Sequence, residues 1–550
     1  AYGVDAGGAL AAAGRARGAL AAPRLDGEAS LEGLRYDGTD WGRVALVHDA
    51  TLGPAPEGEV SLTARGGPYG PARIETAFAL ADRTLSLDGL SAEAAGLRVA
   101  GDLAYRLDDG LADGALELST TDLSALGAQA GTALGGEASG RVVLSSEAGG
   151  QTVEADLTGR GLEGFGARVG AFDLDATVRD ALAAPRGEGR FALEDVSAED
   201  VSLRRLAFEG TAERRDGVIV AEGTLDAEAL DAFGARLASL DADLRAEDAA
   251  GSPALTLDAT ASEFGYAPAE ARVATLRFAG RAEDLTGSPR AEGTLVLEDA
   301  EAAGARLARL TVDGAATDLT GSPSVEAAAT AEGLAYPSAD AEIGLAAFEG
   351  SADDLAGAAS VEGRIVLDAV RAAGAEAARV AFEGSGRDLT GSPSARGTLT
   401  VAALAYPAAD ARVADITLDA QGADLLGAVA ASGTLSAREV SAAGATASAL
   451  EATFSGEGLA TATPTGSLDA RLEDVGAPGA ASGAAALSAA LTADEGGRLV
   501  ASLSADPVAL DAGRVGGVSV EAAATGVHSG ALALDAAARV SDTRFGAARI

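Results

Sequence analysis

The chain has 550 residues, a formal net charge of −42, 47% hydrophobic but only 4% aromatic residues, 73 glycines and no cysteine. The negative charge argues against a nucleic-acid partner, because phosphate-binding surfaces depend on Lys and Arg to release counterions. The absence of cysteine excludes disulfides and thiolate metal sites. Because aromatic residues are few, a thin structure is favoured over a core several layers deep.

The chain divides into three regions by regularity: an irregular N-terminal β region at 1–179, a regular β array at 180–470 and a Gly/Ala-rich β region at 471–550. Residues 1–80 are the least regular, and the Pro/Gly loops LGPAPEGE and RGGPYGPAR indicate a break or bend there. The chain begins at Ala1 with no charged segment followed by an apolar run, so we interpret it as a mature form or a fragment.

Enzyme motifs are weak in every region. GRGLEG at 159–164 matches a dinucleotide-binding pattern, but no helix pattern follows it, and Gly is common enough for a chance match. His48 and His528 are the only histidines and lie far apart in the sequence. We therefore expect no enzyme, no catalytic residue, no metal and no cofactor.

The regular array carries a repeat. DLTGSP begins at Asp284, Asp318 and Asp388, and the related DLAGAA and DLLGAV begin at Asp354 and Asp424, so successive copies are 34, 36, 34 and 36 residues apart. Fainter copies stand at 180–185 and 248–253. The same 70-residue step separates Tyr266, Tyr336 and Tyr406, and also Gly234, Gly304, Gly374 and Gly444. Half-units of about 35 residues thus pair into a 70-residue repeat.

Within each half-unit the apolar residues alternate with polar ones. In GTLVLED, Leu295 and Leu297 point to one face while Thr294 and Val296 point to the other. We predict two antiparallel strands of about a dozen residues per half-unit, with one polar and one aliphatic face.

The turns between these strands have two sequence signatures. In DLTGSP we expect Asp and Ser to cap backbone groups, with Asp an Asx-type cap and not a calcium ligand, while Gly supplies a positive φ and Pro ends the pairing. The AEAAG segment near Gly304 is the opposite turn, and the recurring Tyr is a structural corner whose ring covers a turn.

The aliphatic face is the candidate site, and two arrangements of it remain open. It forms either the filled core of a closed β-solenoid or the lining of an open trough in a sheet curled into a U, and we favour the trough. The candidate groove-lining residues are Leu276, Phe278, Leu295, Leu297, Leu310, Val312, Phe348, Phe382, Ile416 and Leu418.

One uncharged stretch, at 475–493, is about long enough to span a bilayer. It contains Pro478 and only two leucines, and Gly and Ala add little transfer free energy. We expect a Gly/Ala-rich loop or a short helix there.

Three features together resemble the TamB family of translocation and assembly module proteins: the tract from Arg83 to Tyr105, GLADGALEL at 110–118, and the DLTGSP repeats with EGTLVLED. The family belongs with the AsmA-like bridge proteins of Gram-negative bacteria. The resemblance implies an elongated, all-β antiparallel sheet curled into a hydrophobic groove (a β-taco) in the periplasm. It also implies that phospholipid acyl chains pass through the groove between the inner and outer membranes, and that the protein assists outer-membrane protein assembly.

The partners implied by the resemblance are a TamA-like outer-membrane barrel and the inner membrane, reached through an anchor. This chain lacks such an anchor and a recognisable C-terminal docking region, so we expect a middle fragment. The alternative is a closed β-solenoid of the adhesin or autotransporter-passenger type.

Overall fold

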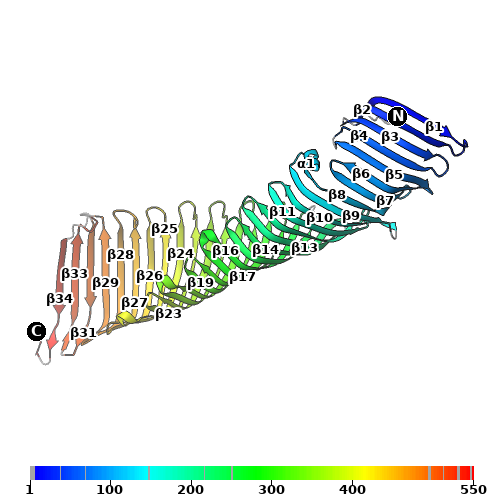
Figure 1. Ribbon diagram of the computed structural model, residues 1–550. Helices are drawn as coiled ribbons and strands as arrows, with labels where there is room; N and C mark the ends of the chain where they lie inside the picture. The colour runs from blue at the N-terminus through cyan, green and yellow to red at the C-terminus, as the bar shows by residue number, and fades with distance from the viewer. Residues whose placement is uncertain are drawn as a thin grey trace. The chain divides into compact units, whose positions relative to one another are not determined.

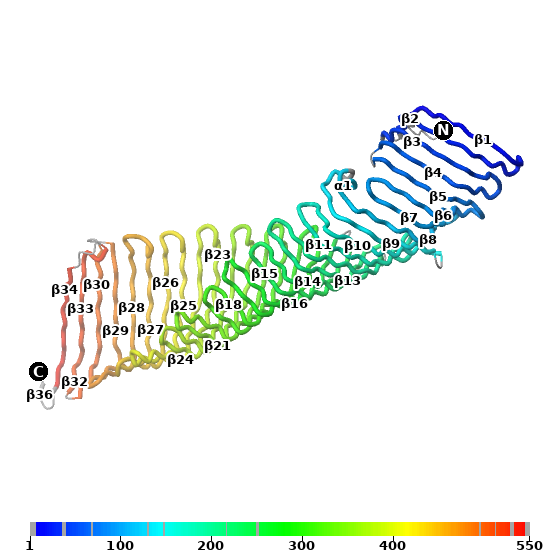
Figure 2. The backbone as a smooth tube through the Cα atoms, viewed as in Figure 1, coloured from blue at the N-terminus to red at the C-terminus, as the bar shows by residue number. Residues whose placement is uncertain are grey.

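The computed structural model describes residues 6–36, 39–67, 70–146, 149–215, 217–248, 252–493, 497–511, 513–528, 533–545 and 548–549. They form two compact units, Ala1–Ala267 and Pro268–Ile550. In each unit most strands lie side by side in chain order (Figure 1), and the backbone trace runs back and forth between two rows of turns (Figure 2).

The elements of the first unit are β1 (Ala6–Arg17), β2 (Arg24–Tyr36), β3 (Thr39–Thr51), β4 (Glu57–Arg65), β5 (Pro71–Ala81), β6 (Thr84–Ala94), β7 (Leu97–Arg106), β8 (Ala112–Thr120), α1 (Ser124–Ala130), β9 (Leu134–Ser145), β10 (Thr152–Gly164), β11 (Ala167–Arg179), β12 (Arg186–Ala198), β13 (Val201–Arg215), β14 (Val218–Ala232), β15 (Ala235–Glu247) and β16 (Ala254–Tyr266). Those that follow are β17 (Ala271–Glu283), β18 (Arg290–Ala302), β19 (Ala305–Thr317), β20 (Ser324–Tyr336), β21 (Ala341–Asp353), β22 (Ser360–Ala372), β23 (Ala375–Arg387), β24 (Ser394–Tyr406), β25 (Ala411–Ala423), β26 (Ala430–Ala442), β27 (Ala445–Glu457), β28 (Thr465–Ala477), β29 (Ala480–Thr492), β30 (Arg498–Ala505), β31 (Val508–Leu510), β32 (Gly513–Val515), β33 (Gly517–Thr525), β34 (Ala533–Ser541), β35 (Arg544–Phe545) and β36 (Ala548–Arg549). Short 3-10 turns, η2 (Ala267–Ala269), η3 (Pro337–Ala339) and η4 (Pro407–Ala409), precede β17, β21 and β25.

The strand pairings within each unit are antiparallel. In the first unit each strand from β1 to β16 pairs with the next, and in the second unit the same holds from β17 to β29. This is a meander of hairpins, which differs from the parallel coils of a β-helix. The structure confirms the all-β class and the repetitive antiparallel sheet, with strands of 13 residues from β15 to β29.

The DLTGSP segments form the row of turns that we call the Asp rim. In each copy the Asp carboxylate accepts a hydrogen bond from the backbone N–H four residues later, at 3.1 Å from Ser288 N to Asp284 Oδ2 and at 3.0 Å from Ser392 N to Asp388 Oδ2. Successive turns are joined as well, since Leu355 N donates to Pro323 O at 3.2 Å. The predicted Asx-type turn is therefore confirmed.

The predicted source of the positive φ in this turn was wrong. Asp284 and Asp388 both have φ of 53°, whereas Gly287 and Gly391 do not have a positive φ. Asp tolerates the left-handed region because its short side chain hydrogen-bonds locally. The Gly is needed for space, because a Cβ at Gly287 would lie 2.7 Å from both carboxylate oxygens of Asp284.

The opposite ends of the strands form the Tyr rim, where two kinds of turn alternate. Ala303 and Gly304 have φ of 48° and 81°, the pattern of a type I′ two-residue hairpin loop. The next turn follows Tyr336 and closes at Asp340, which has φ of 49°. A Cβ at Gly304 would lie 3.7 Å from Cε2 of Tyr336, so the ring covers the neighbouring turn, as predicted for a structural corner.

A column of left-handed residues crosses the even-numbered strands from β12 to β28, three residues before the last residue of each strand. These residues are Asp195, Ala229, Glu263, Asp299, Gly333, Ala369, Ala403, Glu439 and Asp474, with φ from 49° to 66°. We call this column the crease. Residues that are three apart across the crease are alike in chemistry: Leu297 and Ala300 are apolar, whereas Glu298 and Glu301 each form an ion pair with the arginine opposite, at 3.4 Å to Arg309 and 3.0 Å to Arg306. The pleat is thus interrupted at Asp299, and the strand bends there.

The segment 475–493 is neither a loop nor a helix. It comprises the last residues of β28, a short turn and β29, whose Ala485 and Leu487 pair with Leu472 and Ala470. This apolar segment forms strands and not a helix because β29 pairs with β28 on one side and with β30 on the other. In the part of the chain that the structure describes, no helix has the length and hydropathy required to cross a bilayer.

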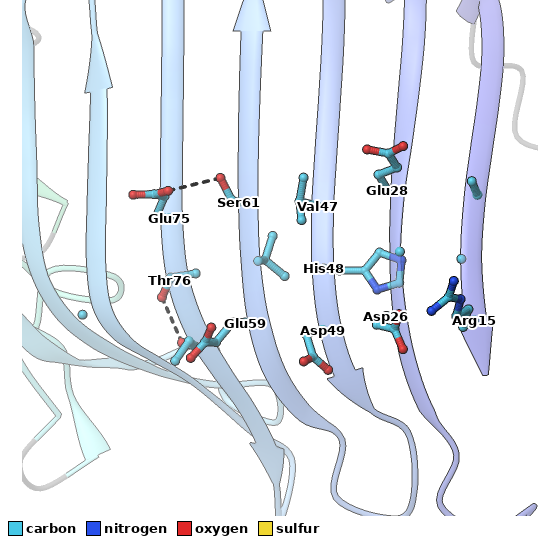
Figure 3. A pocket seen from close by; sticks show the side chains of 16 residues that line it. Arg15, Asp26, Glu28, Val47, His48, Asp49, Glu59, Ser61, Glu75 and Thr76 are labelled. Carbon is cyan, nitrogen blue, oxygen red and sulfur yellow. Dashed lines mark hydrogen bonds between the residues drawn. The ribbon is translucent and has the colours of Figure 1, made fainter. Parts of the chain in front are cut away.

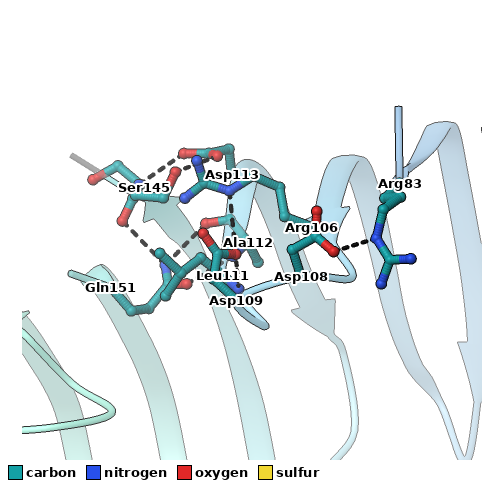
Figure 4. Close-up of polar contacts among 10 residues, drawn as sticks. Arg83, Arg106, Asp108, Asp109, Leu111, Ala112, Asp113, Ser145 and Gln151 are labelled. Carbon is teal, nitrogen blue, oxygen red and sulfur yellow. Dashed lines mark hydrogen bonds and ion pairs between the residues drawn. The ribbon is translucent and has the colours of Figure 1, made fainter. Parts of the chain in front are cut away.

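In the first unit a side chain joins the ends of two strands (Figure 4). Gln151 is buried, with 6% of its surface exposed. Its Oε1 accepts from Ala112 N at 2.8 Å, and its Nε2 donates to the carbonyls of Ala112 and Ser145 at 2.9 and 3.1 Å. The amide therefore satisfies backbone groups of β8 and β9.

Candidate functional site

The ten predicted groove-lining residues lie on one face of the second unit, in two neighbouring register columns. The first column joins directly paired residues of β17–β29: Phe278, Leu295, Val312, Ala329, Phe348, Ile365, Phe382, Leu399, Leu418, Leu435, Ala452, Ala470 and Leu487. The second, two residues nearer the crease, is Leu276, Leu297, Leu310, Ala331, Ala346, Leu367, Val380, Val401, Ile416, Ala437, Leu450, Leu472 and Ala485. Because these positions are two apart along each strand, they share a face, which we call the apolar face.

Glycines form much of a third column, on the side of the first that is nearer the Asp rim. From β17 to β24 the directly paired residues of this column are Gly280, Gly293, Gly314, Ala327, Gly350, Gly363, Gly384 and Gly397. The rings of the first column lie over these glycines: a Cβ at Gly280 would be 2.6 Å from Cζ of Phe278, and one at Gly384 would be 2.6 Å from Cζ of Phe382. Phe and Gly therefore recur together because the ring covers bare backbone.

The large side chains of the apolar face remain partly exposed. Phe348, Ile365 and Phe382, which are consecutive in the first column, keep 41%, 40% and 43% of their surface exposed. Among the described residues no large side chain is fully buried, and the buried apolar residues are mostly alanines. A closed core would bury such phenylalanines, so this face is not covered by a second layer of the chain.

Several of the lowest exposures on this face lie beside the crease. Val273 and Ala377, on the short arm between the crease and the Tyr rim, are 7% exposed, and Ala437, on the long arm, is 8% exposed. Side chains on the inside of a bend shield one another, so these values indicate that each strand bends toward the apolar face. The sheet of this unit is thereby curled around its apolar side.

Outside the crease, the apolar face of β17–β29 carries no ionisable side chain apart from the Tyr336 and Tyr406 phenols, whereas the opposite face is charged. On the opposite face, which we call the polar face, Glu298 accepts from Arg277 at 3.1 Å and from Arg309 at 3.4 Å. Ion pairs at such exposed positions are worth about 0–1 kcal/mol each. They keep the polar face solvated and leave the apolar face free for an apolar ligand.

The same arrangement occurs in the first unit from β10 to β16. There the corresponding column is Leu157, Leu174, Phe191, Phe208, Leu225, Ala242 and Ala259. Phe191 and Phe208 stack with ring centroids 5.6 Å apart. The first unit thus presents an apolar column of its own.

The crease and the glycine column were missed by the sequence reasoning. Alternation continued from Leu276 and Leu310 would place Ala274 and Ala308 in the apolar set, but both lie opposite Asp299 in the crease and are exposed. A signal for the crease was present: the apolar residues Leu297 and Ala300 are three apart, which breaks a period of two.

A second candidate site is an open pocket of about 860 Å³ in the first unit (Figure 3). His48 lies over Gly27, where a Cβ would be 3.3 Å from Nε2, and the rest of the lining includes five acidic residues and Arg15. The hydrogen bond from Arg24 lowers the pKa of Asp49, and that from Arg73 lowers the pKa of Glu75. These carboxylates are held ionised in ion pairs, and no metal-binding group of three His, Asp or Glu side chains occurs among the residues with described positions.

Comparison of the sequence with protein-family models and with curated proteins returned no match.

Proposed function

We propose that this chain is a non-enzymatic, periplasmic, bridge-like scaffold whose apolar face holds the acyl chains of phospholipids. The observation that carries the proposal is the exposure of Phe348, Ile365 and Phe382, each at least 40%, on a face that has no acidic or basic side chain outside the crease. An isolated apolar residue on a surface is ordinary, but an unbroken set of columns marks a binding surface.

The dimensions of the apolar face support this ligand. Thirteen strands about 4.8 Å apart extend for about 58 Å along the second unit, and the nine residues of each long arm, 290–298 in β18, extend for about 30 Å at ~3.4 Å per residue. The resulting area is on the order of 1,000 Å², compared with roughly 300–600 Å² for the largest apolar patch of a typical monomer. Since one leaflet of the hydrocarbon core is about 15 Å thick, a lipid tail fits across the long arm.

The energetics favour movement along the face. Each methylene removed from water contributes about 0.8 kcal/mol, so tails gain from any position on the face. The side chains of the three columns differ in size, but from β17 to β24 all of them are apolar or glycine, so no polar contact fixes a tail at one position. A ligand that binds uniformly along a surface can slide without crossing a large barrier.

The resemblance to the TamB family supplies the cellular setting of the proposal. In that setting the groove conducts phospholipids between the inner and outer membranes of a Gram-negative bacterium and supports outer-membrane protein assembly with a TamA-like barrel. The resemblance also implies an anchor in the inner membrane. The antiparallel meander and the exposed phenylalanines weigh against the closed-solenoid alternative.

Lipid loading tests the proposal. The whole chain is incubated with phospholipid vesicles, re-purified, and its bound lipid is counted by native mass spectrometry and extraction. We expect several lipids per chain, and we expect the triple variant Leu295→Asp, Leu310→Asp and Phe348→Asp to lose them while its far-ultraviolet circular dichroism stays β-type.

The matched control adds the same three charges to the polar face of the same strands, as Val296→Asp, Thr311→Asp and Ala347→Asp. The control is expected to load lipid normally. Equal loading of both variants would refute the assignment of the ligand to the apolar face.

A further inference from the structure

The turns that border the apolar face carry carboxylates and no basic residue. Between β17 and β29 the acidic residues of the turns are Asp284, Asp318, Asp354, Asp388 and Asp424 on the Asp rim and Asp340 and Asp410 on the Tyr rim, and Glu270 stands in the turn before β17. Arginines occur in the strands, where many form ion pairs on the polar face. Both borders of the apolar face are therefore negative at nearly every repeat.

The carboxylates of the Asp rim are held in place. Asp318 Oδ2 accepts from Ser322 N at 3.1 Å and Asp388 Oδ2 from Ser392 N at 3.0 Å, and the Gly three residues later leaves room for the carboxylate group. An ordered charge loses little side-chain entropy when it meets a ligand. The Asp rim is thus a fixed row of negative charge.

An apolar side chain stands beside each of these charges. Leu319, Leu355 and Leu389 follow the Asp of their turns and are 45%, 44% and 37% exposed. The hydrogen bond from Leu389 N to Ala359 O, at 3.1 Å, joins consecutive turns and makes the row continuous. A lipid whose tails lie on the apolar face therefore places its headgroup near a leucine and a carboxylate.

We propose that the two rims select, among two-tailed lipids, those whose headgroup carries an ammonium group and no net negative charge. This inference rests on the proposed function, because it assumes that tails occupy the apolar face. A carboxylate attracts an ammonium group and repels a headgroup with net negative charge. For exposed pairs we expect a preference of about two- to fivefold over an anionic lipid with the same tails, and screening by salt weakens it.

Competition between two lipids tests the proposal. The whole chain is incubated with equimolar vesicles of dioleoyl phosphatidylethanolamine and dioleoyl phosphatidylglycerol, and the ratio of the bound lipids is measured at low and high salt. The expected result is a two- to fivefold excess of phosphatidylethanolamine at low salt that approaches equality at high salt.

Two matched variants assign the preference to the rim. Asp318→Asn, Asp354→Asn and Asp388→Asn remove three rim charges, and Asn keeps both the left-handed conformation and the Asx cap. Glu349→Gln, Glu362→Gln and Glu383→Gln remove three exposed charges from the polar face. The preference should fall in the rim variant and persist in the control.

The outcomes separate this inference from the proposed function. Binding of both lipids in equal amounts at low salt, or a preference that survives in the rim variant, would overturn the headgroup selection and leave lipid binding intact. Failure to bind either lipid would overturn the proposed function itself, and the inference with it.

Discussion

The crease can be tested directly, because it predicts whether an Ala→Gly substitution stabilises or destabilises the strand. Ala403 has φ of 54° and lies three residues before the end of β24, whereas its neighbour Ala402 has no positive φ. In an ordinary strand, replacing Ala by Gly destabilises by about 0.5–1 kcal/mol through the greater backbone entropy of the unfolded chain. In the left-handed region the Cβ of Ala is strained by about 1–2 kcal/mol, and Gly, which has no Cβ, avoids this strain.

Ala403→Gly should therefore stabilise the local structure by about 0.5–1 kcal/mol, the difference between these two terms. Ala402→Gly should destabilise it by a similar amount. The position one repeat earlier is Gly333, with φ of 66°, where a Cβ would lie 3.1 Å from Cβ of Ala308. Gly333→Ala should accordingly destabilise by about 1 kcal/mol.

Hydrogen exchange measures these effects locally, which suits a repeat array that need not unfold in one step. A change of 1 kcal/mol alters the exchange rate of amides in β23–β25 about fivefold, slower in Ala403→Gly and faster in Ala402→Gly. If both variants exchange faster to the same degree, Ala403 is an ordinary strand residue and the crease as we describe it does not exist.

Three further predictions concern other parts of the fold. Gly391→Ala should destabilise the Asp rim by about 1 kcal/mol, since its Cβ would lie 2.6 Å from Oδ1 of Asp388. Asp388→Asn should leave the stability nearly unchanged. Urea unfolding midpoints measure both variants, and an unchanged midpoint for Gly391→Ala would contradict the packing. Gln151→Ala should cost about 1–3 kcal/mol by leaving buried backbone groups of β8 and β9 unpaired, which appears as faster hydrogen exchange there and not in β17–β29. The carboxyl groups of Asp226 and Asp241 share a hydrogen bond that raises the pKa of Asp241, so this contact stabilises the fold below the ordinary Asp pKa and is lost as pH rises through the raised value. Asp241→Asn should therefore stabilise by about 0.2–1 kcal/mol at pH 7 and not at pH 3, and a thermal unfolding midpoint that shifts equally at both pH values would refute this.

Much of the repeat could be derived from the sequence because it depends on local chemistry. The 34- and 36-residue spacing, the period of two around Leu295, and the turn residues after Asp284 each reflect contacts within one hairpin. These features predicted the strands, the two rows of turns and the shared face of the ten apolar residues. The positive φ in the Asp turn was assigned to the Gly, but it belongs to the Asp. Both residue types tolerate the left-handed region, so the sequence alone could not distinguish them. The structure shows that the Gly is required because the Asp carboxylate occupies the space of a Cβ.

The sequence predicted which residues line the candidate site, but not whether another layer of the chain covers them. Alternation places Phe348 and Phe382 on one face, and it does so equally for a sealed core and for an open trough. Whether another layer covers that face depends on segments distant in sequence. The exposure of these rings in the structure decides the question.

The sequence by itself determined the strands, their period and the chemical difference between the two faces, because each follows from residue type at a fixed spacing. Only the tertiary structure decided where the strands bend, since the crease residues Asp299, Gly333 and Ala369 share a conformation but no side-chain type. That conformation is imposed by pairing with the strands on both sides, which place Ala308 and Gly344 opposite the crease. The bend that encloses the apolar face is therefore a property of paired strands and not of any one residue.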